Sequence, residues 1–154
     1  MPLVLNQFDS GVSTALVERL RAYLAALGEE YRAKVVEQTS GDVQEAPLVV
    51  VSATELEEVV YQTGHYRVGL EITVKVDANT GGSQQFKALS AAVLDALQQT
   101  DLVTQLNAVT DETGRALCVV QGITLEQSRI EDVGDWLLRR VYSLNAYGFN
   151  PGNS

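Results

Sequence analysis

The stretch His65-Tyr-Arg-Val-Gly-Leu-Glu-Ile-Thr-Val-Lys-Val-Asp77 decides the fold class of this chain. Apolar and polar residues alternate over its whole length, as they do in a strand with one buried and one solvated face. The predicted buried side chains are Tyr66, Val68, Leu70, Ile72, Val74 and Val76, and the solvated face carries His65, Arg67, Gly69, Glu71, Thr73, Lys75 and Asp77. A solvated face is typical of antiparallel sheets, because parallel sheets are covered on both faces.

Amphipathic helices are predicted on both sides of this strand. Residues 10–27 repeat apolar side chains every three or four positions, and Gly28 follows as a C-terminal cap. A second helix is expected over residues 84–98 with Ser83 as its N-cap, and a short helix follows and ends at Leu106. These helices can cover the apolar face of the sheet.

Further strands are predicted at residues 33–37, 48–53, 116–126 and 135–146, while 54–61 fits a strand or a helical turn. Within 116–126, Leu117, Val119, Ile123 and Leu125 are expected to share one face, and Ser128 to Gly134 reads as a polar connection. The order of elements predicts an α+β fold, with a mostly antiparallel or mixed sheet and two main helices packed on one face. Residues 1–146 form one domain, and 147–154 form a flexible tail.

Composition excludes several classes of protein. The 154 residues are 45% hydrophobic and 20% charged, which fits a globular domain. The 11 Lys and Arg against 20 Asp and Glu leave a net charge of −9, so the chain lacks the basic footprint of a duplex-DNA binder and would be repelled by an anionic membrane. Cys118 is the only cysteine and the longest aliphatic run is Leu48–Val51. We therefore expect a soluble protein made in a cytoplasm.

The sequence contains no convincing catalytic or ligand-binding constellation. His65 is the only histidine, no cysteine pair exists for zinc, and no Gly-x-Ser-x-Gly or phosphate-binding glycine motif is present. The segment that starts at Asp77 fails as a calcium loop, because Gly81 and Ala88 stand where oxygen ligands belong. Cys118 lies in an apolar strand and reads as a core residue. We predict no enzyme activity, no cofactor and no metal site.

The remaining features indicate an interaction protein. The solvated face of the 65–77 strand offers a stripe of mixed charge that suits a subunit contact: His65, Arg67, Glu71, Lys75 and Asp77. Tyr147 and Phe149 add aromatic side chains from the tail. Residues 29–58 hold eight acidic and two basic side chains, and Glu55, Glu57 and Glu58 are their tightest cluster. This acidic stretch is either a solvated surface or a surface directed at a partner.

The pattern resembles the tail terminator (tail completion) proteins of long-tailed bacteriophages. The resemblance covers about residues 10 to 146 and rests on an order of elements rather than on a chemical signature. It is carried by an amphipathic helix from Val12 to Leu27, Pro47-Leu-Val-Val-Val-Ser-Ala53, the strand from Gly64 to Val76, a helix from Phe86 to Leu97, Val119-Val-Gln-Gly-Ile-Thr-Leu-Glu126 and Trp136-Leu-Leu-Arg-Arg-Val-Tyr142.

The resemblance implies a structural virion protein without catalytic residues. Such proteins form a ring, commonly a hexamer, that caps the head-proximal end of the tail tube, stops its polymerisation and provides the surface for head joining. The implied partners are further copies of the chain, the tail tube protein and a head–tail connector or stopper protein. DNA only passes through the lumen, where Glu55, Glu57 and Glu58 are candidates for an acidic lining that repels phosphates.

Other interpretations stay open at this point. A neck or head completion protein of the same junction shares much of the pattern. A hot-dog-like enzyme would use a carboxylate or His65 in a cleft between subunits, and a small cytoplasmic binding domain would form a stable monomer or dimer.

Overall fold

The computed structural model describes residues 8–26, 28, 35–37, 48–60, 65–77, 82–132 and 137–149. The elements follow the order α1 (Phe8–Ala25), β1 (Val35–Glu37), β2 (Leu48–Val60), β3 (His65–Asp77), α3 (Gly82–Leu97), α4 (Leu102–Asn107), β4 (Val119–Asp132) and β5 (Leu137–Phe149). The predicted strand from His65 to Asp77 is present with the same bounds, and the predicted first helix begins two residues earlier, at Phe8.

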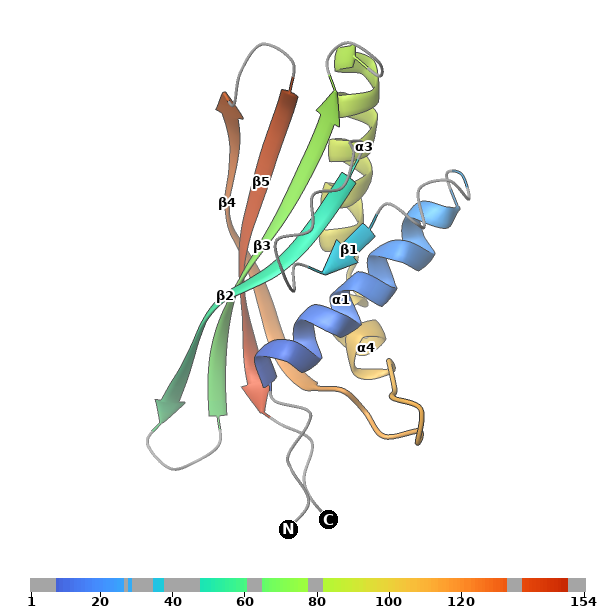
Figure 1. The fold of residues 1–154 in the computed structure, drawn as a ribbon. Helices are drawn as coiled ribbons and strands as arrows, with labels where there is room; N and C mark the ends of the chain where they lie inside the picture. The colour runs from blue at the N-terminus through green and yellow to red at the C-terminus, as the bar shows by residue number, and fades with distance from the viewer. Residues whose placement is uncertain are drawn as a thin grey trace.

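The strands form one five-stranded sheet in the order β1-β2-β3-β5-β4. β1 pairs parallel with β2, and every other neighbouring pair is antiparallel. Helices α1, α3 and α4 all lie against one face of this sheet (Figure 1). The mixed sheet with helices on one side confirms the predicted α+β class. None of the described helices combines the length and the apolar character that crossing a bilayer requires.

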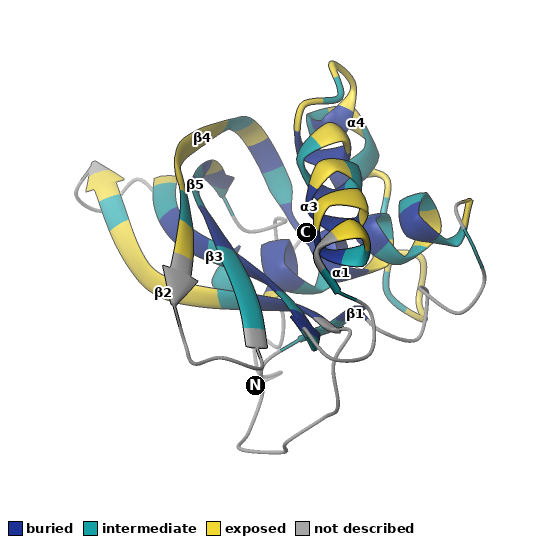
Figure 2. Ribbon diagram, turned by 90° about the horizontal axis from the view of Figure 1, so that it is seen from above, coloured by how far each residue is buried: buried dark blue, intermediate teal, exposed yellow. Residues whose placement is uncertain are grey.

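The hydrophobic core lies between the helices and the sheet. The apolar stripe of α1 contributes Phe8, Val12, Leu16, Leu20 and Leu24, all fully buried. The apolar face of β3 supplies Val68, Leu70, Ile72, Val74 and Val76, as its alternation predicts. α3 and α4 close the layer with side chains such as Phe86, Leu89, Val93, Leu102 and Leu106. Figure 2 shows the buried residues gathered between the helices and the curved sheet.

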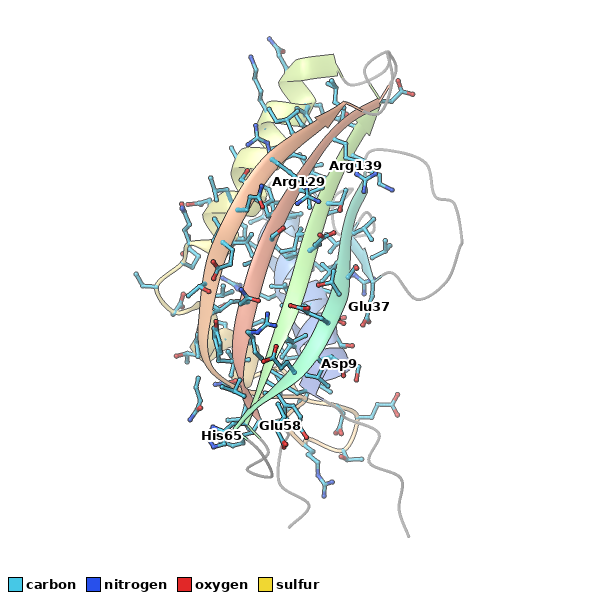
Figure 3. The ribbon with its side chains drawn as sticks, turned by 90° about the vertical axis from the view of Figure 1, so that its left-hand side faces the viewer. Asp9, Glu37, Glu58, His65, Arg129 and Arg139 are labelled. Atoms are coloured by element: carbon cyan, nitrogen blue, oxygen red, sulfur yellow. The ribbon has the colours of Figure 1, made fainter. Side chains whose placement is uncertain are left out.

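The face of the sheet opposite the helices is the open face, and it is turned toward the viewer in Figure 3. It is not solvated throughout. Val50, Thr73 and Val141 lie in one cross-strand row and are buried, as is Gly69. Thr73 and Gly69 were expected on a solvated face. They lie on a central strand, where side chains of both neighbouring strands shield them.

Several strand boundaries differ from the sequence prediction, and β4 begins at Val119 instead of residue 116. β2 continues through the ambiguous residues to Val60. β4 extends to Asp132, so the predicted polar connection from Ser128 is wrong over its first five residues. β5 extends to Phe149, so the predicted start of the tail at Tyr147 is also wrong. In each extension cross-strand pairing overrides weak local propensity: the added parts of β2 and β4 pair with the strand that follows each in the chain, β3 and β5, and the end of β5 pairs with β3 and with the start of β4. Trp136 and the parts of the tail beyond Phe149 lie outside the described residues, as does most of the acidic 29–46 segment.

The predicted faces of β4 are corrected as well. Val120 is buried and packs in the core, whereas Leu125 is exposed. The register of β4 against β5 shifts between Val120 and Gly122 and again between Leu125 and Gln127. Each shift is a bulge that inserts one residue and reverses the alternation of side chains. Leu117 precedes β4, and Val119 shares the open face with Phe149. Ile123 and Leu125 pair instead with Ala146 and Leu144 on the core side, so the four residues do not share one face.

Candidate assembly surface

The structure brings the predicted interface residues together on the open face. His65, Arg67, Glu71, Lys75 and Asp77 alternate along β3 on the side away from the core. Tyr147 and Phe149 join them because Tyr147 is the register partner of Arg67, and Phe149 is that of His65. The rings of His65 and Phe149 are in contact, with centroids 5.5 Å apart. Sequence reasoning placed these two aromatic residues in a flexible tail and missed this neighbourhood.

Arg67 is the centre of a hydrogen-bonded network on this face. Its guanidinium lies 2.8 Å from Glu55 Oε1 and 2.8 Å from Glu57 Oε2, and it donates to Asn145 Oδ1 at 2.8 Å. The hydrogen bonds to Glu57 and then to Glu55 raise the pKa of Arg67 further above its already high ordinary value. The guanidinium is therefore charged at every physiological pH, and it locally neutralises two carboxylates.

The three glutamates predicted as an acidic lining do not form one patch. Glu55 and Glu57 are register partners of Gly69 and Arg67, and both reach the open face. Glu58 pairs with Tyr66, so strand alternation directs it to the helix side of the sheet. The lining of a lumen by these glutamates stays a prediction. Because Arg67 pairs with Glu55 and Glu57, the surface around them carries less negative charge than three unpaired carboxylates would give.

The network continues across the sheet to β4. The hydroxyl of Thr124 donates to Glu126 Oε1 at 2.8 Å. Hydrogen bonds from Thr124 and then from Asn145 hold the pKa of Glu126 below its ordinary value. A polar belt thus crosses four strands, from Thr124 and Glu126 through Asn145 and Arg67 to Glu55 and Glu57. The sequence could have placed Asn145 on the open face, because Asn145 lies an even number of residues from Val141 on the same strand. It could not have placed Glu126 there, because the bulge after Leu125 reverses the alternation of side chains along β4.

A second charged row lies nearer the other end of β3. Arg129 Nη2 lies 3.6 Å from Glu71 Oε1, and Arg129 Nη1 donates to Ser143 Oγ at 3.3 Å. Lys75 and Arg139 face each other across β3 and β5. Figure 3 shows Arg129 and Arg139 on this part of the open face and His65 at its opposite end. Sequence reasoning missed Arg129 because it placed residue 129 in a loop.

The described residues assemble neither a metal centre nor an activated thiol. They contain no group of three or more His, Cys, Asp or Glu side chains placed to hold a metal ion. Cys118 is fully buried, and burial raises the pKa of its thiol to about 11, which makes it a poor nucleophile. The open face instead presents fixed, mutually bonded charges and aromatic rings, an arrangement suited to contact with another protein.

Comparison with known proteins finds matches among solved structures. No protein-family model matches the chain, and no curated protein matches it. The chain shares its fold with a virion protein. That solved structure is a chain of the virion of a native gene transfer agent (GTA) particle, with a TM-score of 0.64 and 22% sequence identity. The match covers 90% of this chain and 94% of the other, so the whole architecture is shared.

Proposed function

We propose that this protein is a structural virion protein, a tail terminator that forms a ring on the head-proximal end of a tail tube. The observation that carries the proposal is the fold shared over nearly the full length of both chains with a component of a virion. The sequence resemblance to tail terminators points independently in the same direction. In this role the ring stops tube polymerisation and presents a surface for head joining.

The architecture suits a ring of identical subunits. A ring needs heterologous contacts, in which one surface of each copy meets a different surface of the next. The sheet ends in two different edge strands, β4 on one side and β1 with β2 on the other. The open face between them carries the polar belt, whose charges are paired within the chain and leave no strong field to attract DNA.

Of the three candidates Glu55, Glu57 and Glu58, the first two line the lumen, where DNA passes, when the open face is turned toward it, whereas strand alternation directs Glu58 to the helix side of the sheet. Acidic side chains there repel phosphates and prevent DNA from adhering during ejection. A reconstruction of the assembled ring tests this placement. Finding these glutamates on the outer rim would remove the lumen assignment while leaving ring formation intact.

The first experiment measures assembly directly. The purified protein is examined by light scattering and negative-stain microscopy, alone and after mixing with tubes of the tail protein from the same virion. We expect rings of about six subunits that cap one end of each tube and halt its growth. Binding to the head connector without binding to tubes would instead assign the chain to the neck. A stable dimer that ignores both partners would overturn the virion proposal.

A further inference from the structure

Four of the five exposed large hydrophobic side chains lie on two strands. Ile130 is 66% exposed, Val59 52%, Leu56 38% and Leu125 37%, and these four belong to β2 or β4, whereas the fifth, Tyr147, is 37% exposed and lies on β5. Isolated exposed apolar residues are normal on a protein surface. Here four of them fall on the strands nearest the two edges of the sheet, which Figure 2 shows as long exposed stretches.

Both strands also carry unpaired backbone edges. β1 pairs only with Val49–Val51, so within the described part of the chain no strand covers the outer edge of β2 from Ser52 to Val60. On β4, the side chain of Asn107 bonds both the N–H and the C=O of Val120, at 2.7 and 2.9 Å. Beyond Val120 no described strand pairs with that edge. Long edges with exposed apolar side chains are surfaces that other strands join.

Bulges define which parts of these edges are regular. On β2 the register shifts between Ala53 and Glu55 and between Glu58 and Val60, so Glu55–Glu58 is an uninterrupted run. On β4 the run that follows the last shift extends from Gln127 to Asp132. Because strand directions alternate through β2, β3, β5 and β4, β4 of one copy lies antiparallel to β2 of a second copy in the same orientation.

We propose that β4 of one copy pairs with β2 of the next, with Leu56 opposite Ile130 and Glu57 opposite Arg129. The proposal rests on the ring proposed above and names the contact that builds it. The two faces agree in this register. Leu56 and Ile130 pair with core-side positions and lie on the helix side, whereas Glu57 and Arg129 both lie on the open face. Glu57 is 63% and Arg129 36% exposed, so both can reach a neighbouring copy.

The charges that lie opposite each other distinguish this register from the main alternative register, in which Leu56 lies opposite Leu125. Placing Leu56 opposite Leu125 would bring Glu55 beside Glu126 and would give Glu57 no cation. In the proposed register, Glu57 meets Arg129, and oppositely charged cross-strand pairs stabilise a sheet. Glu55 lies opposite a glutamate in both registers, Glu131 in the proposed one and Glu126 in the competing one, so that position does not distinguish them and the Glu57–Arg129 pair does.

Disulfide trapping tests the register. In a Cys118→Ala background, we introduce Leu56→Cys and Ile130→Cys in the same chain, since residues directly opposite on paired strands have Cβ atoms close enough for a disulfide. Oxidation is expected to give a ladder on a non-reducing gel that ends at the full ring. Each single variant should stop at dimers. The matched control, Leu56→Cys with Leu125→Cys, should give no ladder.

A substitution at the most exposed position tests the contact without cross-linking. Ile130→Asp should leave the thermal unfolding of the subunit unchanged, because Ile130 is largely solvated, and should reduce the population of rings at least tenfold. Ile130→Val should retain them. Normal ring formation by the Ile130→Asp variant would overturn this contact, and so would rings whose Leu56→Cys, Ile130→Cys subunits give no ladder. Either result would still be compatible with the proposed ring function. Absence of rings in the unmodified protein, with and without tubes, would overturn the proposed function itself.

Discussion

At Gly148 three segments meet so closely that no side chain fits. A Cβ at this position would lie 2.0 Å from the carbonyl oxygen of Val119 and 2.9 Å from Cε1 of Phe8. Gly148 therefore allows β5 to pack at once against β4 and against the first turn of α1. Gly122, also on a strand, has no atom within 4 Å of the same virtual Cβ. The two glycines thus form a matched pair for mutagenesis.

We expect Gly148→Ala to lower the free energy of unfolding by about 1–3 kcal/mol, the usual cost of forcing extra volume into a packed site. The backbone of β4 or the ring of Phe8 would have to move. Gly122→Ala should leave stability unchanged or slightly raise it, because alanine restricts the unfolded chain. Urea unfolding followed by circular dichroism measures both. Equal effects of the two substitutions would contradict the close packing at Gly148.

At the scale of the element, the short strand β1 is held by α1 rather than by its own length. The carboxylate of Glu37 accepts hydrogen bonds from the hydroxyls of Ser13 and Thr14, and Ser13 is only 2% exposed. Arg21 Nε donates to the carbonyl oxygen of Val35 at 2.9 Å. These side-chain bonds fix β1 beside β2, where three residue pairs alone would be a weak ladder.

Removing this carboxylate should loosen the strand. We expect Glu37→Ala to cost about 1–3 kcal/mol, since the buried hydroxyl of Ser13 loses its charged acceptor. Glu37→Gln keeps an acceptor oxygen and should recover part of that loss. Amide hydrogen exchange should accelerate in β1 and at Val49–Val51, while the β3–β5 pair keeps its protection. Faster exchange throughout the sheet would show that Glu37 acts globally instead.

The sequence predicts best those elements in which apolar and polar residues alternate regularly from the first residue to the last. β3 alternates over thirteen residues, and its bounds and core face follow directly from that period. β4 and β5 are longer than predicted, because the end of β4 pairs with the start of β5 and the end of β5 pairs with β3 and with the start of β4. Local propensity does not contain that pairing. The bulges of β4 add a further change of face that no periodicity reveals.

The same distinction applies to the candidate surface. The stripe on β3 was predicted because alternation places its residues together. Its partners Asn145, Glu126 and Arg129 come from other strands and depend on register, which the sequence does not specify. Tyr147 and Phe149 were singled out correctly as aromatic residues but assigned to a tail, and only their pairing with Arg67 and His65 locates them.

At the scale of the whole molecule, the buried thiol of Cys118 and the buried phenol of Tyr142 make the free energy of unfolding depend on pH in the alkaline range. Burial raises the pKa of the Cys118 thiol to about 11, and burial also raises the pKa of Tyr142 above its ordinary value. The unfolded chain loses the thiol proton near pH 9, before the folded chain does. The contribution of the thiol is therefore complete below pH 9 and is lost as the pH rises toward 11, and that of Tyr142 is lost only above pH 10.

We expect the free energy of unfolding to fall between pH 9 and 11, with a slope of at most about 1.4 kcal/mol per pH unit for one group. The Cys118→Ala variant should have a lower free energy of unfolding below pH 9, because the substitution leaves a small cavity. Above pH 9 its free energy of unfolding should fall less steeply than that of the unmodified protein. Urea titrations at half-unit intervals of pH measure this difference. Parallel curves for the two proteins would assign the alkaline loss to other groups.

The close approach of Phe8 to Gly148 also decides where fluorescent labels can report the orientation of the subunit. The first described helix begins where the last described strand ends, and Figure 1 shows the start of α1 and the end of β5 at the same end of the described fold. A fluorophore attached at the start of α1 or at the end of β5 therefore marks one pole of the subunit. The start of α3 follows the far end of β3 and marks the opposite pole, where exposed Gln84 accepts a second dye. Quenching of one dye by a labelled tube would tell which pole of the subunit faces it.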